Sequence, residues 1–262
     1  PPDYWTQPVG VLLALLLAAG TVASVIALTG RIGHDRKVQG VVTAVSSPAP
    51  DVTEIVCRLD GAWRGHQAGQ FAFVGLERFE GSHPFTIASA DHGDRSLTFQ
   101  IKALGDYTRQ LASRVAVGQA VTVEGPYGRF VLGRQDHKAR QIWVAGGIGV
   151  TPFLAWLDAL RADPAAAPTV ELHYSTRGAA HDPFVERLRS LCAELPSVSL
   201  HIHDRAAGDD LTPERLAATA TDGQRAEVWF CGPRGFGDQL KAGLARLWGR
   251  RLSFRREAFE MR

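Results

Sequence analysis

The chain has 262 residues, which is room for two ordinary domains. Its charge is nearly balanced, with 29 Lys and Arg against 27 Asp and Glu, and no basic stretch marks a nucleic-acid-binding face. Cys57, Cys192 and Cys231 have no Cys-x-x-Cys spacing, which argues against a disulfide framework, a zinc site and an iron–sulfur cluster. The main body is therefore expected in a reducing compartment.

Near the N-terminus lies an apolar run, residues 9–28, enclosed between Asp3 and Arg31 with no charge inside it. Its length is about the 20 residues that a membrane-spanning helix needs. Basic residues follow the run and none precedes it, so its C-terminal side is expected in the cytoplasm. A signal peptide would carry its positive charge ahead of the run, and a buried core helix is the other alternative.

Residues 38–135 consist of short β-rich segments separated by turn residues. Strands are expected at 38–45, 53–58, 70–74, 85–89, 97–102 and 121–124, with one helix over 108–114. Turns are expected at 46–50, 91–94 and 125–128. Six short strands with one helix predict a small antiparallel β-barrel.

From residue 141 onward, strands alternate with helices. Strands are expected at 142–145, 170–174, 198–202 and 228–230, and helices at 153–161, 184–193, 213–220 and 236–248. This alternation predicts a Rossmann-like α/β domain, a parallel sheet with helices on both faces. With the boundary in the polar stretch 133–140, the expected parts are 1–37 (helix and basic linker), 38–135 (barrel) and 136–262 (α/β domain).

The segment His83-Pro84-Phe85-Thr86 carries groups that suit a flavin nucleotide. Phe85 offers an aromatic plane to the ring, and Thr86 a hydroxyl to the ring edge where hydride arrives. His83 and Lys102 suit the phosphates, and Gly105-Asp106-Tyr107-Thr108 leads into a helix whose N-terminus favours anions. The alternative is an ordinary barrel strand with a core phenylalanine.

Together, the segments 83–89 and 104–108 resemble the flavin domain of the NADPH oxidase and ferric reductase family, part of the ferredoxin–NADP reductase superfamily. The superfamily's common motif is Arg-x-Tyr-Ser/Thr, and His83 in place of Arg is the oxidase and ferric reductase variant. The resemblance runs from residue 38 to the end. It implies that FAD is bound by His83, Pro84, Phe85, Thr86, Lys102, Gly105, Tyr107 and Thr108. Lys102 stands where the family often has Arg, so the phosphate contact there is expected to differ.

A second motif, Gly146-Gly147-Ile148-Gly149-Val150-Thr151-Pro152, follows the apolar strand 142–145. Glycines allow a pyrophosphate to approach the backbone, and a helix N-terminus supplies oriented N–H groups. Thr151 is expected at the N-cap and Pro152 at the first helical position. The motif falls short of a complete Gly-x-Gly-x-x-Gly fingerprint. We expect Gly146, Gly147, Gly149, Thr151 and Pro152 to bind a dinucleotide.

The strand 170–174 leads to Ser175, Thr176 and Arg177. An NAD-specific site usually has an acid at this place to hold the ribose 2′-hydroxyl, whereas these residues suit a 2′-phosphate. Asp182, the nearest acid, is expected to cap the next helix. NADPH is therefore the expected cofactor, with NADH as the alternative.

Cys231-Gly232-Pro233 follows the last expected strand. In the family this loop faces the nicotinamide, and the cysteine lies beside the carbon that releases hydride; the alternative is a small buried cysteine. By the same resemblance, Phe259 corresponds to a C-terminal aromatic that covers the flavin and has to move before hydride transfer, which needs near-contact. Thr86, Cys231 and Phe259 are the expected catalytic residues.

His201 and His203 alternate on an expected strand and so share a face, but the sequence reveals no third ligand near them. No metal site is therefore expected.

In the family, the last helix of a haem-binding membrane domain leads into the flavin domain, and residues 9–28 match that helix. Histidine pairs on earlier helices hold the haems, and none of the nine histidines lies in the run. Because the chain begins Pro1-Pro2 without Met, we expect it to belong to a longer protein or to meet a separate haem-binding membrane subunit. Haem is thus expected in that domain, not in this chain.

The expected function is that of a flavoprotein dehydrogenase attached to the inner membrane, with its catalytic domains on the cytoplasmic side and the lipid bilayer as a partner. It would pass electrons from NAD(P)H through FAD to membrane haem, for reduction of ferric iron or oxygen. Two alternatives are a flavin reductase component of an oxygenase and an inactive membrane-tethered regulatory module.

Overall fold

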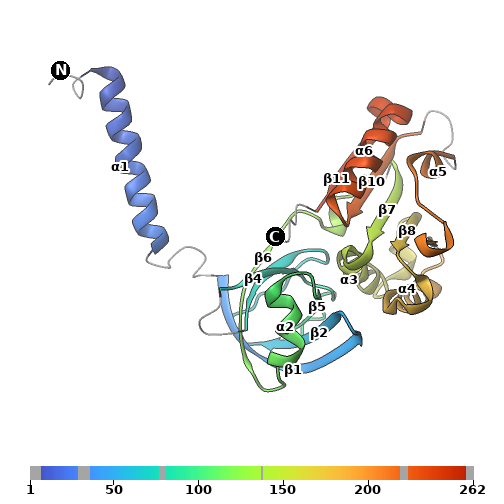
Figure 1. Cartoon of the computed structure of the whole chain (residues 1–262), viewed down its shortest axis with the longest axis horizontal. Coiled ribbons are helices and arrows are strands. Elements are labelled where there is room, and N and C mark those ends of the chain that lie inside the picture. The colour runs from blue at the N-terminus through green and yellow to red at the C-terminus, as the bar shows by residue number, and fades with distance from the viewer. Residues whose placement is uncertain (1–6, 29–35, 77–80, 137, 219–223, 258–262) are drawn as a thin grey trace. The chain divides into compact units, whose positions relative to one another are not determined.

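A computed structural model describes residues 7–28, 36–76, 81–136, 138–218 and 224–257. The contacts within the chain divide it into two units, Pro1–Lys37 and Val38–Arg262. The second unit contains two β-sheets, and Figure 1 labels strands of both sheets and the α-helices of this unit.

The first unit contains one helix, α1 (Pro8–Leu28), which carries no charged residue. Leucine side chains such as Leu12, Leu15 and Leu16 are exposed along it. The hydroxyls of Thr21 and Ser24 donate to the carbonyls of Leu17 and Gly20 one turn earlier, so the helix itself satisfies them. By length and composition, residues 8–27 can cross a membrane. The expected apolar helix is therefore present.

The first sheet of the second unit is an antiparallel barrel. Its strands are β1 (Lys37–Ala49), β2 (Val52–Leu59), β3 (Phe71–Gly75), β4 (His83–Thr86), β5 (Ser96–Lys102) and β6 (Ala120–Tyr127), in the order β4-β3-β6-β1-β2-β5. A bridge between Ile87 and Phe99 joins the two edges and closes the sheet. Helix α2 (Asp106–Arg114) follows β5. The expected barrel is confirmed.

Two of the expected turns are wrong, because the strands continue through them. β1 runs on to Ala49, and β6 includes Gly125, Pro126 and Tyr127. In both places the strand pairing shifts register, between Ser46 and Ala49 and opposite Phe71–Phe73. Irregular pairing of this kind accommodates proline and glycine inside a strand.

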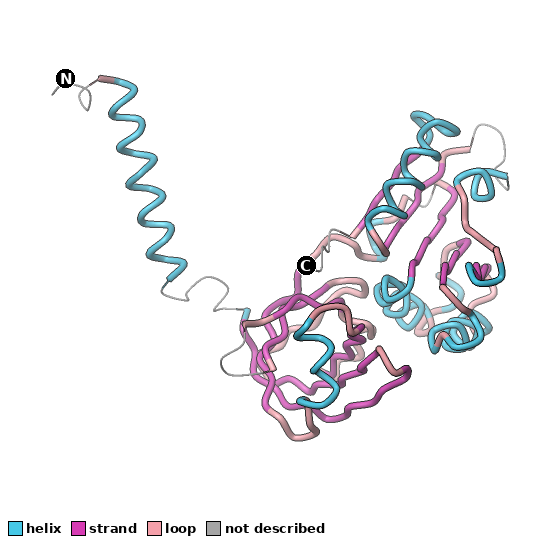
Figure 2. Tube along the Cα trace, viewed as in Figure 1, coloured by secondary structure: helices cyan, strands magenta, loops and turns pink. Residues whose placement is uncertain are grey.

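The second sheet is parallel throughout. Its strands are β7 (Arg140–Gly146), β8 (Val170–Thr176), β9 (Val198–Asp204), β10 (Ala226–Cys231) and β11 (Leu252–Arg256), in the order β11-β10-β7-β8-β9. Its helices are α3 (Thr151–Leu160), α4 (Pro183–Ala193), α5 (Pro213–Ala218) and α6 (Arg234–Trp248). Figure 2 distinguishes these strands and helices by colour.

Helices cover both faces of this sheet, as expected. Side chains of α3 and α4 pack in one core cluster with Trp143, Leu172 and Tyr174. Those of α5 and α6 pack in another with Ile142 and Val144, which alternate with Trp143 along β7. The edge strand β11 was not predicted, because Arg255 and Arg256 interrupt its apolar pattern.

The chain order of the strands reverses between β7 and β10. From β7 the sheet continues through β8 to β9 on one side, and through β10 to β11 on the other. In open parallel sheets, ligands bind outside the carboxyl ends of the strands at such a switch point. The residues directly after β7 and β10 therefore mark the expected binding crevice.

Within the second unit, an aromatic cluster and several hydrogen bonds join the barrel to the parallel sheet. Phe130 stacks on Trp156 with ring centroids 5.0 Å apart, and Trp156 Nε1 donates to the Ala68 carbonyl at 2.9 Å. On the same helix, the Asp158 carboxylate accepts from the Ala90 amide at 2.9 Å. These contacts fix the barrel and the sheet relative to each other.

His66, in the loop before β3, gives the stability of the protein a pH dependence. Its Nε2 donates to the Ser89 carbonyl at 3.0 Å, and burial lowers its pKa despite this bond and the nearby Asp91. An unfolded histidine takes up its proton near pH 6.5, so below that pH the unfolded chain binds more protons than the folded one. We expect the free energy of unfolding to fall on acidification, by up to about 1.4 kcal/mol per pH unit from this residue.

Urea unfolding at about pH 7.5 and about pH 5.5 measures this effect. The pH dependence should be weaker in His66→Gln than in the wild type. Equal pH dependence in the two proteins would exclude His66 as a source.

Candidate functional site

The register of β4 against β3 decides which side chains of the His83–Thr86 segment face outward. Ala72 pairs with Phe85, and Ala72 is fully buried in the barrel core. Phe71 pairs with Thr86 and Phe73 with Pro84. Because successive side chains of a strand point to opposite faces, Pro84 and Thr86 lie on the outer face beside the two phenylalanines.

The expectation that Phe85 offers an open ring face is wrong. Its side chain is only 6% exposed and belongs to the barrel core. The physical reason is the alternation of β4, which turns Phe85 inward when Thr86 faces outward. The Phe85 side chain thus packs in the barrel core, and the side chains of its neighbours Pro84 and Thr86 lie on the outer face of β4.

Three half-buried rings, Phe71, Phe73 and Tyr127, form what we call the outer aromatic patch. Their ring centroids lie 5.7–5.8 Å apart. Phe71 is the cross-strand partner of both Thr86 and Tyr127. Such a surface suits a flat aromatic ligand. The patch was not predicted from the sequence, although the spacing of the two phenylalanines in β3 was a usable signal.

A cavity of about 480 Å³ opens beside this patch. Gln70, Pro126 and Gly128 line it next to the patch, and Arg64 and Arg134 add two positive charges against the one carboxylate of Asp91. The cavity and the patch together suit a ligand with a flat ring and an anionic part.

At the start of β4, the His83 ring stacks on the Tyr107 ring of α2, with centroids 4.0 Å apart. His83 Nε2 is buried and has no hydrogen-bond partner among the described residues. A buried nitrogen without a partner is costly unless a ligand supplies one. A bound flavin nucleotide could supply the missing hydrogen-bond partner of this nitrogen, and in this respect the barrel fits such a ligand.

Two other predicted FAD contacts have partners within the chain. The Thr108 hydroxyl accepts from the amides of Leu104 and Gly105 at 2.9 and 3.0 Å, so it stabilises the start of α2. Lys102 Nζ forms an ion pair with Asp51 at 3.1 Å. Both groups would have to share or exchange these partners to bind a phosphate.

The glycine motif forms a 3-10 turn, η4 (Gly147–Val150), that continues into α3. The expected N-cap is therefore off by one residue: Val150 is the N-cap of α3, Thr151 is the first helical residue and Pro152 the second. The Thr151 hydroxyl donates to the Ile148 carbonyl at 3.2 Å, and the side chains of Thr151 and Pro152 are buried. These two residues shape the helix start and do not line an open site.

Packing between the glycine motif and the Cys231-Gly232-Pro233 loop is backbone against backbone. A Cβ at Gly149 would collide with the Cys231 carbonyl and lie 2.7 Å from the Gly232 nitrogen. A Cβ at Gly146 would lie 2.9 Å from Pro233 Cδ. Glycine is thus required for the two loops to meet. The structure brings together two motifs that lie more than 80 residues apart, at the switch point of the sheet.

Gly147 has a different role from its neighbours. Its φ of +54° lies in the left-handed region, and a Cβ there would point into open space. The backbone at this position is accessible to a ligand, as a pyrophosphate-binding turn requires.

Cys231 is a free cysteine at the end of β10. Burial and the Glu257 carboxylate raise the pKa of its thiol well above the usual range. The thiol is therefore uncharged at neutral pH, and a nucleophilic thiolate mechanism is not supported.

At the end of β8, Arg177 is exposed, whereas Ser175 and Thr176 are buried. Asp182 is the N-cap of α4, accepting from the Phe184 amide at 2.9 Å, and also accepts from the Tyr174 hydroxyl at 2.7 Å. The expected capping role of Asp182 is confirmed. Ser175 is less accessible than expected, because β8 is an inner strand, and Arg177 is the predicted 2′-phosphate contact that lies open to a ligand.

Phe259, the predicted shield of the flavin, lies outside the described residues, as do Arg31 and His34 of the basic linker. The role expected of Phe259 stays a prediction.

The expectation that His201 has no third ligand nearby is wrong. Glu171 and His173 of the adjacent strand β8 lie beside it, and the possible ligand atoms of the three residues are within 4.8 Å of one another. The sequence could not reveal this group, because it depends on the register that pairs His173 with His201.

The comparisons with known proteins agree with this geometry. Residues 41–131 match the family described as an FAD-binding domain. The chain is 28% identical over 154 residues to the anthranilate 1,2-dioxygenase electron transfer component of Acinetobacter baylyi, covering 56% of this chain and 43% of that protein. It is 39% identical over 85 residues to human dual oxidase 1, covering 29% of this chain and 5% of that protein.

Among solved structures, a ferredoxin NADP⁺ reductase from Neisseria gonorrhoeae with bound FAD and NADP has the same fold, with a TM-score of 0.67 and 18% identity. The similarity covers 84% of this chain and 98% of that one. Residues 41–131 thus match an FAD-binding domain, and the chain shares the fold of a ferredoxin NADP⁺ reductase structure. The aligned segments span less than half the length of the curated relatives described above.

Proposed function

We propose that the chain is the dehydrogenase module of a membrane-attached electron-transfer protein. In this proposal residues 38–135 form the flavin domain and residues 136–262 form the nucleotide domain, as predicted from the sequence. The module takes hydride from NADPH to FAD and passes single electrons to a membrane haem domain. The observation that carries the proposal is the meeting of the Gly146–Gly149 turn with the Cys231–Pro233 loop at the switch point of the sheet.

In the barrel, the outer face of β4 supports the flavin ring. Pro84 and the outer aromatic patch provide apolar contact, and the Thr86 hydroxyl is available to hydrogen-bond the ring edge. His83 Nε2, which lacks a partner within the described chain, is available for a further hydrogen bond. When bound, FAD supplies a two-electron acceptor that can release electrons singly.

In the nucleotide domain, the accessible backbone at Gly147 binds the pyrophosphate, and Arg177 binds the 2′-phosphate. Cys231 lies against the nicotinamide as an uncharged thiol, so it positions the ring and takes no proton from it. η4 lies beside β5 of the barrel, which keeps the nucleotide-binding turn close to the flavin domain. Hydride transfer needs this closeness, because the donor carbon and the acceptor atom must almost touch.

Two observations favour a membrane haem domain as electron acceptor: the apolar helix α1, and the similarity to dual oxidase 1. The final product, reduced iron or reduced oxygen, depends on that domain. The second candidate function is a reductase component of an oxygenase, favoured by the anthranilate 1,2-dioxygenase electron transfer component. An iron–sulfur cluster needs four ligands, usually cysteines, and this chain has three cysteines at scattered positions. As an oxygenase reductase, too, the chain would therefore pass its electrons to a separate acceptor.

Anaerobic spectroscopy tests the proposed function. The full chain in detergent should bind FAD in a one-to-one ratio, and NADPH should then bleach the flavin absorbance. A folded protein that binds no FAD, or bound FAD that NADPH leaves oxidised, would contradict the proposal.

Protease added to sealed inverted membrane vesicles should cut residues 38–262 if this body faces the cytoplasm.

Arg177→Ala tests the choice of cofactor. A charge-assisted hydrogen bond to phosphate is worth about 1.5–3 kcal/mol, so kcat/KM for NADPH should fall about 10- to 100-fold. The value for NADH should stay unchanged. Arg189→Ala, which removes an exposed arginine of α4, is the matched control and should leave both values as they are. An equal loss with both cofactors would refute the 2′-phosphate role.

A further inference from the structure

Four side chains gather on one face of the parallel sheet, at its β8–β9 edge. Glu171 and His173 alternate on β8, and His201 and His203 alternate on β9. The register pairs His173 with His201. We call these four residues the histidine cluster. It lies within β8 and β9, before the strand ends at which the nucleotide is proposed to bind.

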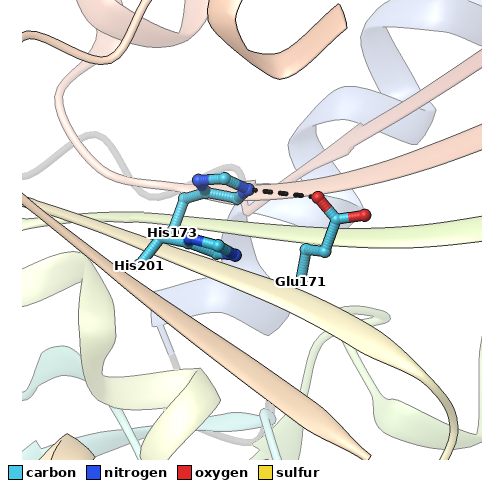
Figure 3. A group of neighbouring side chains, drawn as sticks. All are labelled: Glu171, His173 and His201. Carbon is cyan, nitrogen blue, oxygen red and sulfur yellow. Dashed lines mark ion pairs between the residues drawn. The ribbon is translucent and has the colours of Figure 1, made fainter. Parts of the chain in front are cut away.

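Two members of this cluster are buried, His173 with 7% and His203 with 6% of the surface exposed, and of the three possible metal ligands only His173 is buried. The His173 Nε2 atom is buried, has no hydrogen-bond partner among the described residues and lies 3.7 Å from Glu171 Oε2. A dashed line marks this pair in Figure 3. That distance is too long for a hydrogen bond. It is close to the roughly 3.4 Å that separates two ligands of a tetrahedral zinc ion, given bonds of about 2.0–2.1 Å.

The hydrogen bonds around His173 leave a position for a cation. Its Nδ1 lies 3.0 Å from His203 Nε2, and His203 Nδ1 lies 3.5 Å from Asp209 Oδ2. This row of two imidazoles between two carboxylates has three contacts, but two neutral imidazoles bring only two protons. One of the three contacts therefore lacks a proton, so a nitrogen lone pair faces either a carboxylate or the nitrogen of the other imidazole, whichever way the protons are placed. A metal ion between Glu171 and His173 resolves this conflict, with the proton on His173 Nδ1 donated to His203.

We infer that Glu171, His173 and His201 bind a divalent transition-metal ion of the zinc type. Two imidazoles and one carboxylate are a donor set that zinc prefers, with a fourth position open to water. The exposed His201 ring stacks on His173 with centroids 4.6 Å apart, and the possible ligand atoms of the three residues lie within 4.8 Å of one another, so this surface side chain has to turn to bind the ion.

Outer contacts already orient two of the three ligands. Arg140 donates to both oxygens of Glu171, at 2.7 and 2.6 Å, and a carboxylate has lone pairs enough to accept these bonds and bind a cation. His203 holds the Nδ1 side of His173. Partners of this kind fix the orientation and tautomer of metal ligands. The ion would tie the edge strand β9 to β8, and this inference does not depend on the proposed electron transfer.

Equilibrium dialysis with Zn²⁺ tests the site. The full chain in detergent, first stripped with a chelator, should bind one zinc ion. His201→Gln should weaken binding at least about 10-fold, the lower end of what even outer-shell changes cost. Because His201 is exposed, this variant keeps the core intact. His181→Gln is the matched control, since His181 is an exposed histidine of the same domain outside the cluster, and it should bind like the wild type.

Thermal unfolding gives a second readout. Zn²⁺ should raise the unfolding midpoint of the wild type and of His181→Gln but not that of His201→Gln, because an ion that binds only the folded state stabilises it. The inference is overturned if the wild type retains no zinc, or if His201→Gln retains it with unchanged affinity.

Discussion

Gly149→Ala is expected to slow flavin reduction by NADPH about 100-fold, the cost of displacing reacting groups by about an ångström. The added Cβ would overlap the Cys231 carbonyl and press on the Gly232 nitrogen, which are backbone atoms that no side-chain rotation can move. The two loops at the switch point must therefore separate. Stopped-flow measurement of flavin absorbance under argon gives the rate directly.

FAD affinity should stay unchanged in Gly149→Ala, because the substitution lies outside the barrel. Gly133→Ala is the matched control, since a Cβ there meets nothing within 4 Å. It should reduce its flavin at the wild-type rate. A wild-type rate in Gly149→Ala would show that contact between the loops is not needed for hydride transfer.

Trp156→Ala is expected to lower the free energy of unfolding by about 3–5 kcal/mol, the usual cost of deleting a buried aromatic side chain. The Trp156 ring is fully buried and packs on Phe130, Trp143 and Trp229, with centroids 4.9–5.3 Å away. The change also removes the hydrogen bond to the Ala68 carbonyl, which links the barrel to α3. Urea unfolding measures the loss.

Leu247→Ala is the control for this prediction, because Leu247 is an exposed apolar residue of α6. Its effect should stay within about 0.5 kcal/mol. If Trp156→Ala costs no more than this control, the aromatic cluster does not hold the barrel and the sheet together.

Much of the fold could be predicted from the sequence because local patterns determine it. Short β-rich segments between turn residues predicted the barrel strands, and the run from strand to glycine to helix predicted the nucleotide-binding turn. Prediction failed where the pairing of neighbouring strands determines where a strand lies or ends. The strands continue through Ser46–Ala49 and Gly125–Tyr127 because bulged pairing tolerates their prolines. β11 could not be predicted, because its place follows from pairing with β10.

For the candidate site, too, local motifs could be predicted from the sequence, whereas features that depend on strand pairing could not. The sequence singled out Gly146 and Gly149 for contact with a pyrophosphate, whereas in the structure they allow close approach of the Cys231–Pro233 loop. It could not decide whether Phe85 faces the flavin or the core, because this depends on the register of β4 against β3. The outer aromatic patch and the histidine cluster were missed for the same reason: each is assembled from neighbouring strands.

The central claim is that this chain delivers hydride from a bound nicotinamide directly to a bound flavin. Stopped-flow reduction of the FAD-loaded chain under argon, with NADPH carrying deuterium at the transferred position of its nicotinamide, tests it most directly. We predict that NADPH bleaches the flavin in a single turnover and that the deuterated cofactor does so more slowly, because the transferred bond breaks in that step. A flavin that stays oxidised in the presence of saturating NADPH would contradict the claim.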